Sequence, residues 1–96
     1  MQLLNLFARA TDKSTATIPT ELRQAEFDKV RALYVDDFVR QIWMRGDEPG
    51  ACMIVEANSA TEAAEAVSAL PLVRAGYLKS PTIIPLKPYA GFAPSN

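Results

Sequence analysis

Histidine is absent from this 96-residue sequence, and cysteine occurs only once, as Cys52. A single cysteine cannot close a disulfide within the chain, which excludes a disulfide-stapled secreted miniprotein. Without histidine, a tetrahedral zinc site of His and Cys ligands is excluded, and so is catalysis by a serine–histidine or cysteine–histidine pair. We therefore expect no metal site, and only carboxylates, Tyr, Lys or Cys remain as groups that could move a proton.

The sequence also lacks an excess of either charge and any long apolar run. Lys plus Arg number 10 and Asp plus Glu number 11, which gives a net charge of −1, whereas nucleic-acid binding usually requires a basic face. The apolar start, Met1 to Phe7, is too short for a membrane span and has no basic flank of the kind found in signal peptides. We expect a cytoplasmic protein that binds neither nucleic acid nor membranes. The length allows one domain, covering residues 1–96.

The spacing of apolar residues predicts six elements in the order strand, helix, strand, strand, helix, strand. The four strands are expected over 3–9, 38–45, 51–57 and 82–87. The two helices are expected over 20–35 and 59–70. Polar loop residues (11–20) precede the first helix, and a short irregular link with one possible helical turn follows the second. This order is that of the ferredoxin-like α+β fold with a four-stranded antiparallel sheet, and its last strand, interrupted by prolines, is expected at an edge.

The first helix is expected to bury one apolar stripe and to expose its charges. Phe27, Val30, Leu33 and Tyr34 fall at helical spacing on one face. Glu26 lies on the flank with other charged residues, where a solvated helix face is the usual outcome. In the second helix the stripe consists of small residues, which favours a close approach of that helix to the sheet.

Both sides of the third predicted strand are apolar, with Met53 and Val55 on one side and Cys52 and Ile54 on the other. Two helices can cover only one face of a four-stranded sheet. A second copy packed sheet to sheet with twofold symmetry would bury the other face. We therefore expect a homodimer or a higher even oligomer, with the aromatic tail at 89–96 bracing the partner. A monomer with an open apolar face is the alternative.

The second predicted strand has two sides of different composition. Phe38, Ile42 and Met44 share one side, which is expected to face the helices as core. Val39 falls on the other side, together with the polar and aromatic residues of the candidate site. The alternation thus predicts one structural side and one functional side.

The candidate ligand site consists of Gln41, Trp43 and Arg45, an amide, an aromatic ring and a cation on one side of this strand. Trp43 can stack on a flat ligand, and Arg45 can hold a carboxylate. Arg74 and Tyr77, from the irregular link, could reach the mouth of the same cleft. The structural alternatives are an interfacial tryptophan, rim and surface arginines, and a half-buried tyrosine.

Glu56 is the candidate catalytic residue. It follows an apolar strand, and burial there without a partner would raise its pKa, as suits a general base. A solvated or capping carboxylate at the strand end is the alternative. Cys52 is expected to be an inert buried thiol.

Three segments, 41–45, 53–56 and Leu70-Pro71-Leu72, resemble the muconolactone isomerase-like family of the dimeric α/β-barrel superfamily, which also includes YciI-related proteins. The resemblance covers about residues 38–88 and the order of the elements. It implies a ferredoxin-like subunit and a sheet-to-sheet barrel dimer. It also implies proton transfer without a cofactor on a small lactone or enol acid, so that a small carboxylate or lactone is the expected ligand.

Individual residues both match and depart from that family. Trp43 matches the family's strand tryptophan, whereas Met44 stands where an arginine follows it, and Arg45 comes one place later. Gln41 and Glu48 stand where muconolactone isomerase carries histidines. Whether the chain is an enzyme therefore stays open. A non-catalytic small-ligand-binding or accessory barrel dimer is the second hypothesis, and a purely structural or interaction domain is the third.

Overall fold

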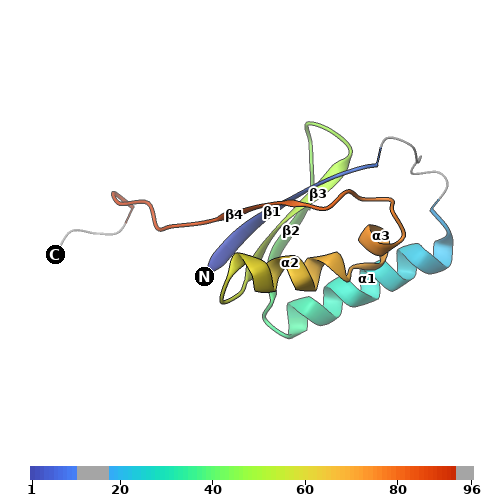
Figure 1. Ribbon diagram of the computed structural model, residues 1–96, viewed down its shortest axis with the longest axis horizontal. Coiled ribbons are helices and arrows are strands. Elements are labelled where there is room, and N and C mark those ends of the chain that lie inside the picture. Colours follow the sequence, from blue (N-terminus) through green and yellow to red (C-terminus); the bar gives the residue numbers. More distant parts are fainter. Residues whose placement is uncertain (11–17, 93–96) are drawn as a thin grey trace.

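The computed structural model describes residues 1–10 and 18–92. These residues form a four-stranded antiparallel sheet with helices packed on one of its faces (Figure 1). The strands are β1 (Gln2–Ala8), β2 (Val39–Met44), β3 (Gly50–Glu56) and β4 (Thr82–Pro85). The helices are α1 (Thr20–Val35), α2 (Ala60–Ser68) and the single turn α3 (Pro71–Arg74). The strand order β2-β3-β1-β4 confirms the predicted ferredoxin-like fold and places β4 at an edge, as its prolines predicted.

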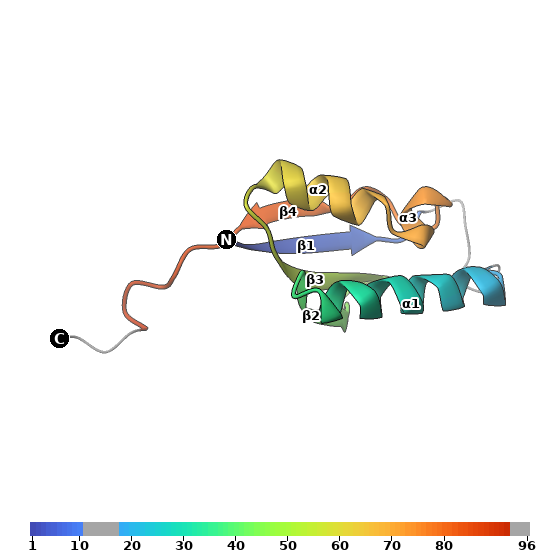
Figure 2. The same cartoon turned by 90° about the horizontal axis from the view of Figure 1, so that it is seen from below.

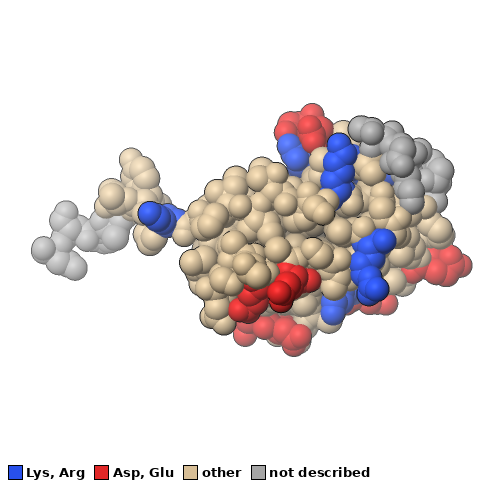
Figure 3. Space-filling model, viewed as in Figure 1, with Lys and Arg blue, Asp and Glu red and all other residues tan. Residues whose placement is uncertain are grey.

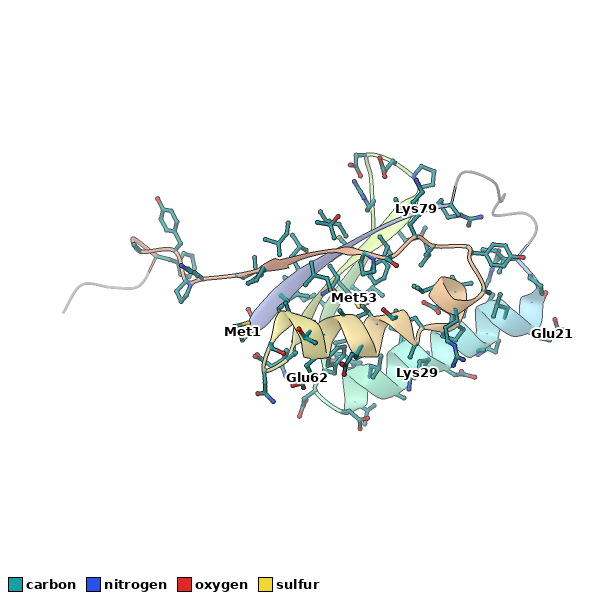
Figure 4. All side chains as sticks on the ribbon, viewed as in Figure 1. Met1, Glu21, Lys29, Met53, Glu62 and Lys79 are labelled. Atoms are coloured by element: carbon teal, nitrogen blue, oxygen red, sulfur yellow. The ribbon has the colours of Figure 1, made fainter. Side chains whose placement is uncertain are left out.

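The alternation of side chains along β1 divides the sheet into two faces. Leu3 and Phe7 are fully buried beneath the helices, whereas Leu4 and Leu6 are half-buried on the opposite face. Met53 of β3 is also buried on the helix side, where Figure 4 labels it. The buried core consists of Leu3, Phe7, Val39, Met53, Val55, Ala57, Ala63, Val67, Leu70 and Leu78.

Helix α2 begins and packs as the sequence predicted. The Ser59 hydroxyl accepts the backbone N–H of Glu62 at 3.1 Å, which satisfies one of the otherwise unpaired amides of the first turn. Ala63 and Val67 are fully buried against the sheet, because small side chains let the helix axis approach closely. Figure 2 shows α2 beside β4 and β1, and α1 beside β2 and β3.

Helix α1 is rotated about its axis relative to the prediction. Glu26 is its buried residue, at 9% exposure, while Phe27 and Tyr34 are 56% and 61% exposed. The half-buried Val30 and Leu33 share the inward stripe with Glu26, because they lie one and two turns further along the helix. The predicted solvated Glu26 and the predicted burial of Phe27 and Tyr34 are therefore wrong.

A β-bulge at the start of β2 changes which side chains face the helices. Val39 pairs with Val55, but the next registered pair joins Gln41 to Ile54, so that Arg40 is an extra residue in β2. The bulge reverses the alternation and turns Val39 into the core, where it is 2% exposed. The prediction that Val39 shares a face with Gln41 is wrong for this reason.

Beyond the bulge, the helix side of β2 is poorly covered. Ile42 and Met44 face the helix side, as their register with β3 shows, but they are 43% and 87% exposed. Phe38, just before β2, packs against the core and is half-buried. The side predicted for Ile42 and Met44 is correct, but their burial is not, because β2 is an edge strand that α1 does not cover completely.

The sheet face opposite the helices is apolar and uncovered by any described residue. Its half-buried or exposed members are Leu4, Leu6, Trp43, Cys52, Ile54 and Ile84. Trp43 is 64% exposed and Ile84 is 41% exposed. Large apolar patches of this kind usually mark interaction surfaces.

After β4 the chain runs away from the body of the protein (Figures 1 and 2). The N–H of Leu86 still donates to the carbonyl of Gln2 at 2.9 Å. Further on, Tyr89 and Phe92 are 79% and 88% exposed. Part of the predicted tail, 93–96, and part of the predicted loop, 11–17, lie outside the described residues.

Candidate functional site

A carboxylate lies buried between α1 and α3. Glu26 accepts the backbone N–H of Leu72, the second residue of α3, through Oε1 at 3.0 Å. Burial raises the pKa of Glu26 because it disfavours the ionised form, and the hydrogen bond from Leu72 offsets this only in part. A carboxyl group with a raised pKa holds and releases protons closer to neutral pH than an exposed glutamate does.

The backbone around Leu72 joins this carboxylate to the end of β1. The Leu72 carbonyl accepts the N–H groups of Tyr77 and Leu78, at 2.9 and 3.2 Å. The Tyr77 carbonyl in turn accepts the N–H of Ala10 at 3.0 Å. Helix α1, the α3 turn and the end of β1 therefore meet at one end of the sheet.

This end of the molecule is rich in cations. The Arg9 guanidinium lies over the Tyr77 ring, 5.9 Å from its centroid, within the range of a cation–π interaction. Arg74 ends α3 and is exposed, and the backbone N–H of Lys79 donates to the Ala8 carbonyl at 2.9 Å. Figure 3 shows basic side chains over this half of the face, with acidic ones at its edges, and an acidic group over the α2 half. In Figure 4, Lys79 lies near the turn between β2 and β3, and Glu62 lies on α2 at the other end of the helix layer.

A second buried polar group lies under the helices. Asn5 is fully buried on β1, in register with Met53 and Ile83, and its Nδ2 donates to the Leu3 carbonyl at 3.2 Å. Its Oδ1 accepts no hydrogen bond from the described residues. Buried acceptors are normally paired, so Asn5 marks a polar position inside an otherwise apolar face.

The structure divides the predicted ligand residues among separate regions. Gln41 and Trp43 lie on the open face, in register with Ile54 and Cys52. The sheet therefore separates them from Glu26, which lies on the helix side. Arg74 ends α3 and Tyr77 lies just beyond it, apart from Gln41 and Trp43, so their role in binding a ligand stays a prediction.

Arg45 is held by acids of the β2–β3 hairpin turn, the segment 45–49 that joins the two strands. Its Nε and Nη2 donate to the two carboxylate oxygens of Asp47 at 3.0 and 2.7 Å, and Glu48 lies 3.4 Å from Nη1. Nη1 also donates to the Phe7 carbonyl at 3.4 Å. The guanidinium lowers the pKa of Asp47 to about 2. These contacts fix the hairpin and occupy the donors that a ligand carboxylate would use.

Glu56 lies at the opposite end of the sheet from Tyr77. One of its carboxylate oxygens is 2.8 Å from the amino group of Met1, and its side chain is 45% exposed. The same amino group donates to the Ala57 carbonyl at 2.8 Å. The proton-transfer role of Glu56 stays a prediction, with the strand-end ion pair as its structural setting.

Glu26 and Asn5 are the polar residues that sequence reasoning missed. Both leave a signal in the pattern: Glu26 lies four residues before Val30, in the middle of the apolar stripe that faces the sheet, and Asn5 lies between Leu3 and Phe7 on the alternating strand. A polar residue at an inward position is a stronger indication of a site than one on a flank.

A shallow concavity of about 280 Å³ lies between the end of α1 and the start of β2. Its lining residues are Tyr34, Val35, Asp37, Val39 and Arg40. Arg40 lies 3.6 Å from Asp37, and both side chains are well exposed. Within the described residues, no group of three or more His, Cys, Asp or Glu side chains is placed to hold a metal ion.

The fold is shared with two enzymes of known structure. Muconolactone isomerase superposes with a TM-score of 0.76 at 15% sequence identity, over 100% of this chain and 98% of that one. The 5-chloro-2-hydroxyhydroquinone dehydrochlorinase of Burkholderia phenoliruptrix, solved with 2,5-dihydroxybenzoquinone, superposes with a TM-score of 0.72 at 17% identity, over 91% and 94% of the two chains.

Comparison with protein-family models gives no match, and comparison with curated protein sequences gives none. The superposition shows that the chain has the ferredoxin-like fold of muconolactone isomerase, and the predicted resemblance is confirmed as a structural one. In the part of the chain that the structure describes, no helix is long and apolar enough to cross a bilayer.

Proposed function

We propose that this protein is a subunit of a dimeric α/β barrel that binds a small carboxylate or lactone and moves a proton on it without a cofactor. The observation that carries the proposal is the buried Glu26 carboxylate with its raised pKa, between α1 and the α3 turn. The two structural neighbours also support the proposal, because both are named for reactions of small cyclic molecules.

Glu26 is better placed for this chemistry than Glu56. Glu56 is half exposed, and its carboxylate already forms an ion pair with the amino group of Met1. Glu26 is shielded from solvent, where a carboxylate is a stronger base and holds its proton longer. In its ionised form Glu26 would take a proton from the carbon next to the substrate carbonyl and leave an enolate. Returning that proton to a different carbon of the conjugated system completes an isomerisation, with no atom gained or lost.

The cations at the same end provide recognition of an anionic ligand. Arg74 is exposed at the end of α3, and Tyr77 is half-buried just beyond it, so the two are proposed to contact the carboxylate and the ring of the ligand. Arg45, tied to Asp47, is proposed to hold the hairpin in place beside this mouth rather than to bind the ligand directly.

The dimer rests on the open face of the sheet. Leu4, Leu6 and Ile54 are half-buried there, and a second copy would cover them. Gln41 and Trp43 would then lie in the space between the two sheets, where any ligand contact they make is in the barrel interior. If the protein sediments as a monomer at micromolar concentration, this part of the proposal is contradicted.

The catalytic proposal is tested by proton exchange. Muconolactone is incubated with the protein in D2O, and loss of the signal of the proton next to the carbonyl is followed by NMR. We expect exchange with the wild type and at least a hundredfold slower exchange with Glu26→Gln, because the amide cannot accept the proton. The rate should rise with pH through the raised pKa of Glu26, since the ionised form is the base.

Glu56→Gln is the matched control, and it should exchange within about twofold of the wild type. The opposite result, with Glu56→Gln inactive and Glu26→Gln active, would return the catalytic role to Glu56. Saturable binding of muconolactone without any exchange would instead favour the non-catalytic binding protein, which agrees with the occupied donors of Arg45.

A further inference from the structure

Two apolar surfaces of this chain lack a partner within the described residues. The first is the tail segment, Pro88–Phe92, which contains the exposed Tyr89 and Phe92. The molecule measures 54 × 28 × 20 Å, and the tail segment projects from the body along the longest of these axes (Figure 1). Within this segment, the N–H of Phe92 donates to the carbonyl of Tyr89 at 3.1 Å.

The second surface lies along α1 and β2 and includes the concavity lined by Tyr34 and Val35; we call it the α1–β2 groove. Its apolar members are Phe27, Tyr34 and Val35 of α1 and Ile42 and Met44 of β2, all between 43% and 87% exposed. Tyr34 lines the 280 Å³ concavity together with Val39 and Arg40, which places this flank of α1 beside β2. Phe27 lies two turns before Tyr34 on the same flank and so extends the groove along β2.

We propose that the tail segment of one copy docks in the α1–β2 groove of a second copy. This inference rests on the sheet-to-sheet dimer proposed above and adds the exchange of the tails to it. Each chain then gives one tail and receives one, so that the assembly closes with twofold symmetry and both apolar surfaces are covered.

The position of the tail favours a second copy over the tail's own chain. Strands β4 and β2 are opposite edges of the sheet, with β3 and β1 between them, and the tail leaves β4 pointing away from the sheet (Figure 2). The tail is also continuous with the open face. Leu86 shares the side of Ile84, which pairs with Leu4 on that face, so a partner seated on the open face lies next to the start of the tail.

Photo-cross-linking tests the contact directly. Phe92 is replaced by p-benzoyl-phenylalanine, a conservative aromatic exchange at an exposed position, and the protein is mixed with an equal amount of isotopically labelled chain. After irradiation, mass spectrometry identifies the linked residues and tells adducts between chains from adducts within one chain. We expect adducts between chains at α1 and β2 residues of the groove. The same probe at the exposed Ser68 of α2 is the control and should give no adduct between chains.

Sedimentation of the same sample separates the outcomes. Suppose the protein sediments as a dimer, but the adducts lie within one chain, lie elsewhere on the partner or do not form. Tail docking would then be overturned, while the sheet-to-sheet dimer would stand. A monomer would overturn both. As a second measurement, Tyr89→Ser combined with Phe92→Ser should weaken dimerisation at least tenfold without changing the unfolding temperature of the diluted monomer. An unchanged dissociation constant would count against the proposal.

Discussion

Helices α1 and α2 cover the same face of one sheet in different ways. Helix α2 places Ala63 and Val67, both fully buried, directly on the sheet. Helix α1 buries a carboxylate, Glu26, and leaves Phe27 and Tyr34 exposed on its flank. The α2 half is therefore built for packing, whereas the α1 half keeps polar and apolar groups that packing does not use. That difference locates the candidate function in the α1 half.

The largest expected effect is the loss of packing in the α2 half. Val67→Ala removes two methyl groups from a fully buried site and should lower the free energy of unfolding by about 2 kcal/mol. Phe27→Ala, a larger truncation at a 56% exposed site on α1, should change it by less than about 0.5 kcal/mol. Urea unfolding at a concentration where the protein is monomeric measures both. Equal losses for the two variants would remove the contrast between the helices.

The helix starts differ in the same direction. Ser59 caps α2 through its hydroxyl, whereas α1 begins after Pro19 without a side-chain cap. Ser59→Ala should lower stability by about 1 kcal/mol. Thr61→Ala, at an exposed position of the same first turn, is the control and should be close to neutral. If both substitutions had the same effect in thermal unfolding, the cap would contribute nothing beyond helix propensity.

The last difference is one of pH dependence. The folded-state pKa of Glu26 is raised above its unfolded value, so its contribution to stability is fully present below the unfolded pKa near 4.5 and is lost as pH rises through the folded pKa. Glu26→Gln keeps an acceptor for the Leu72 N–H but cannot ionise. The variant should therefore lose less stability than the wild type between pH 4 and pH 8. Parallel stability curves over this range would show that Glu26 is not perturbed.

The order and type of the elements could be read from the sequence because the signals are local. The apolar spacing of the strands and helices and the prolines of β4 each act within a few residues. The structure has helix α1 at Thr20–Val35, the range that the apolar spacing predicted. The apolar sides of β3 predicted the open face for the same reason, since alternation is a property of the strand alone.

The face of α1 and the role of Glu26 could not be read in this way. Phe27 and Tyr34 form an apolar stripe as regular as the one that is buried, and the choice between them depends on the rest of the fold. The donor to Glu26 is Leu72, 46 residues further along the chain. The bulge at Arg40 likewise depends on the pairing of β2 with β3, which no pattern within β2 reveals.

Chemical-shift mapping with muconolactone, the lactone used in the exchange experiment proposed above, tests most directly whether the α1 half is the functional one. The compound is titrated into the isotopically labelled protein, and backbone amide shifts are followed by NMR. We expect saturable shifts centred on the amides of Glu26, Leu72 and Tyr77, with the amides of α2 unchanged. Saturable shifts centred on α2, or no saturable shift around Glu26, would contradict it.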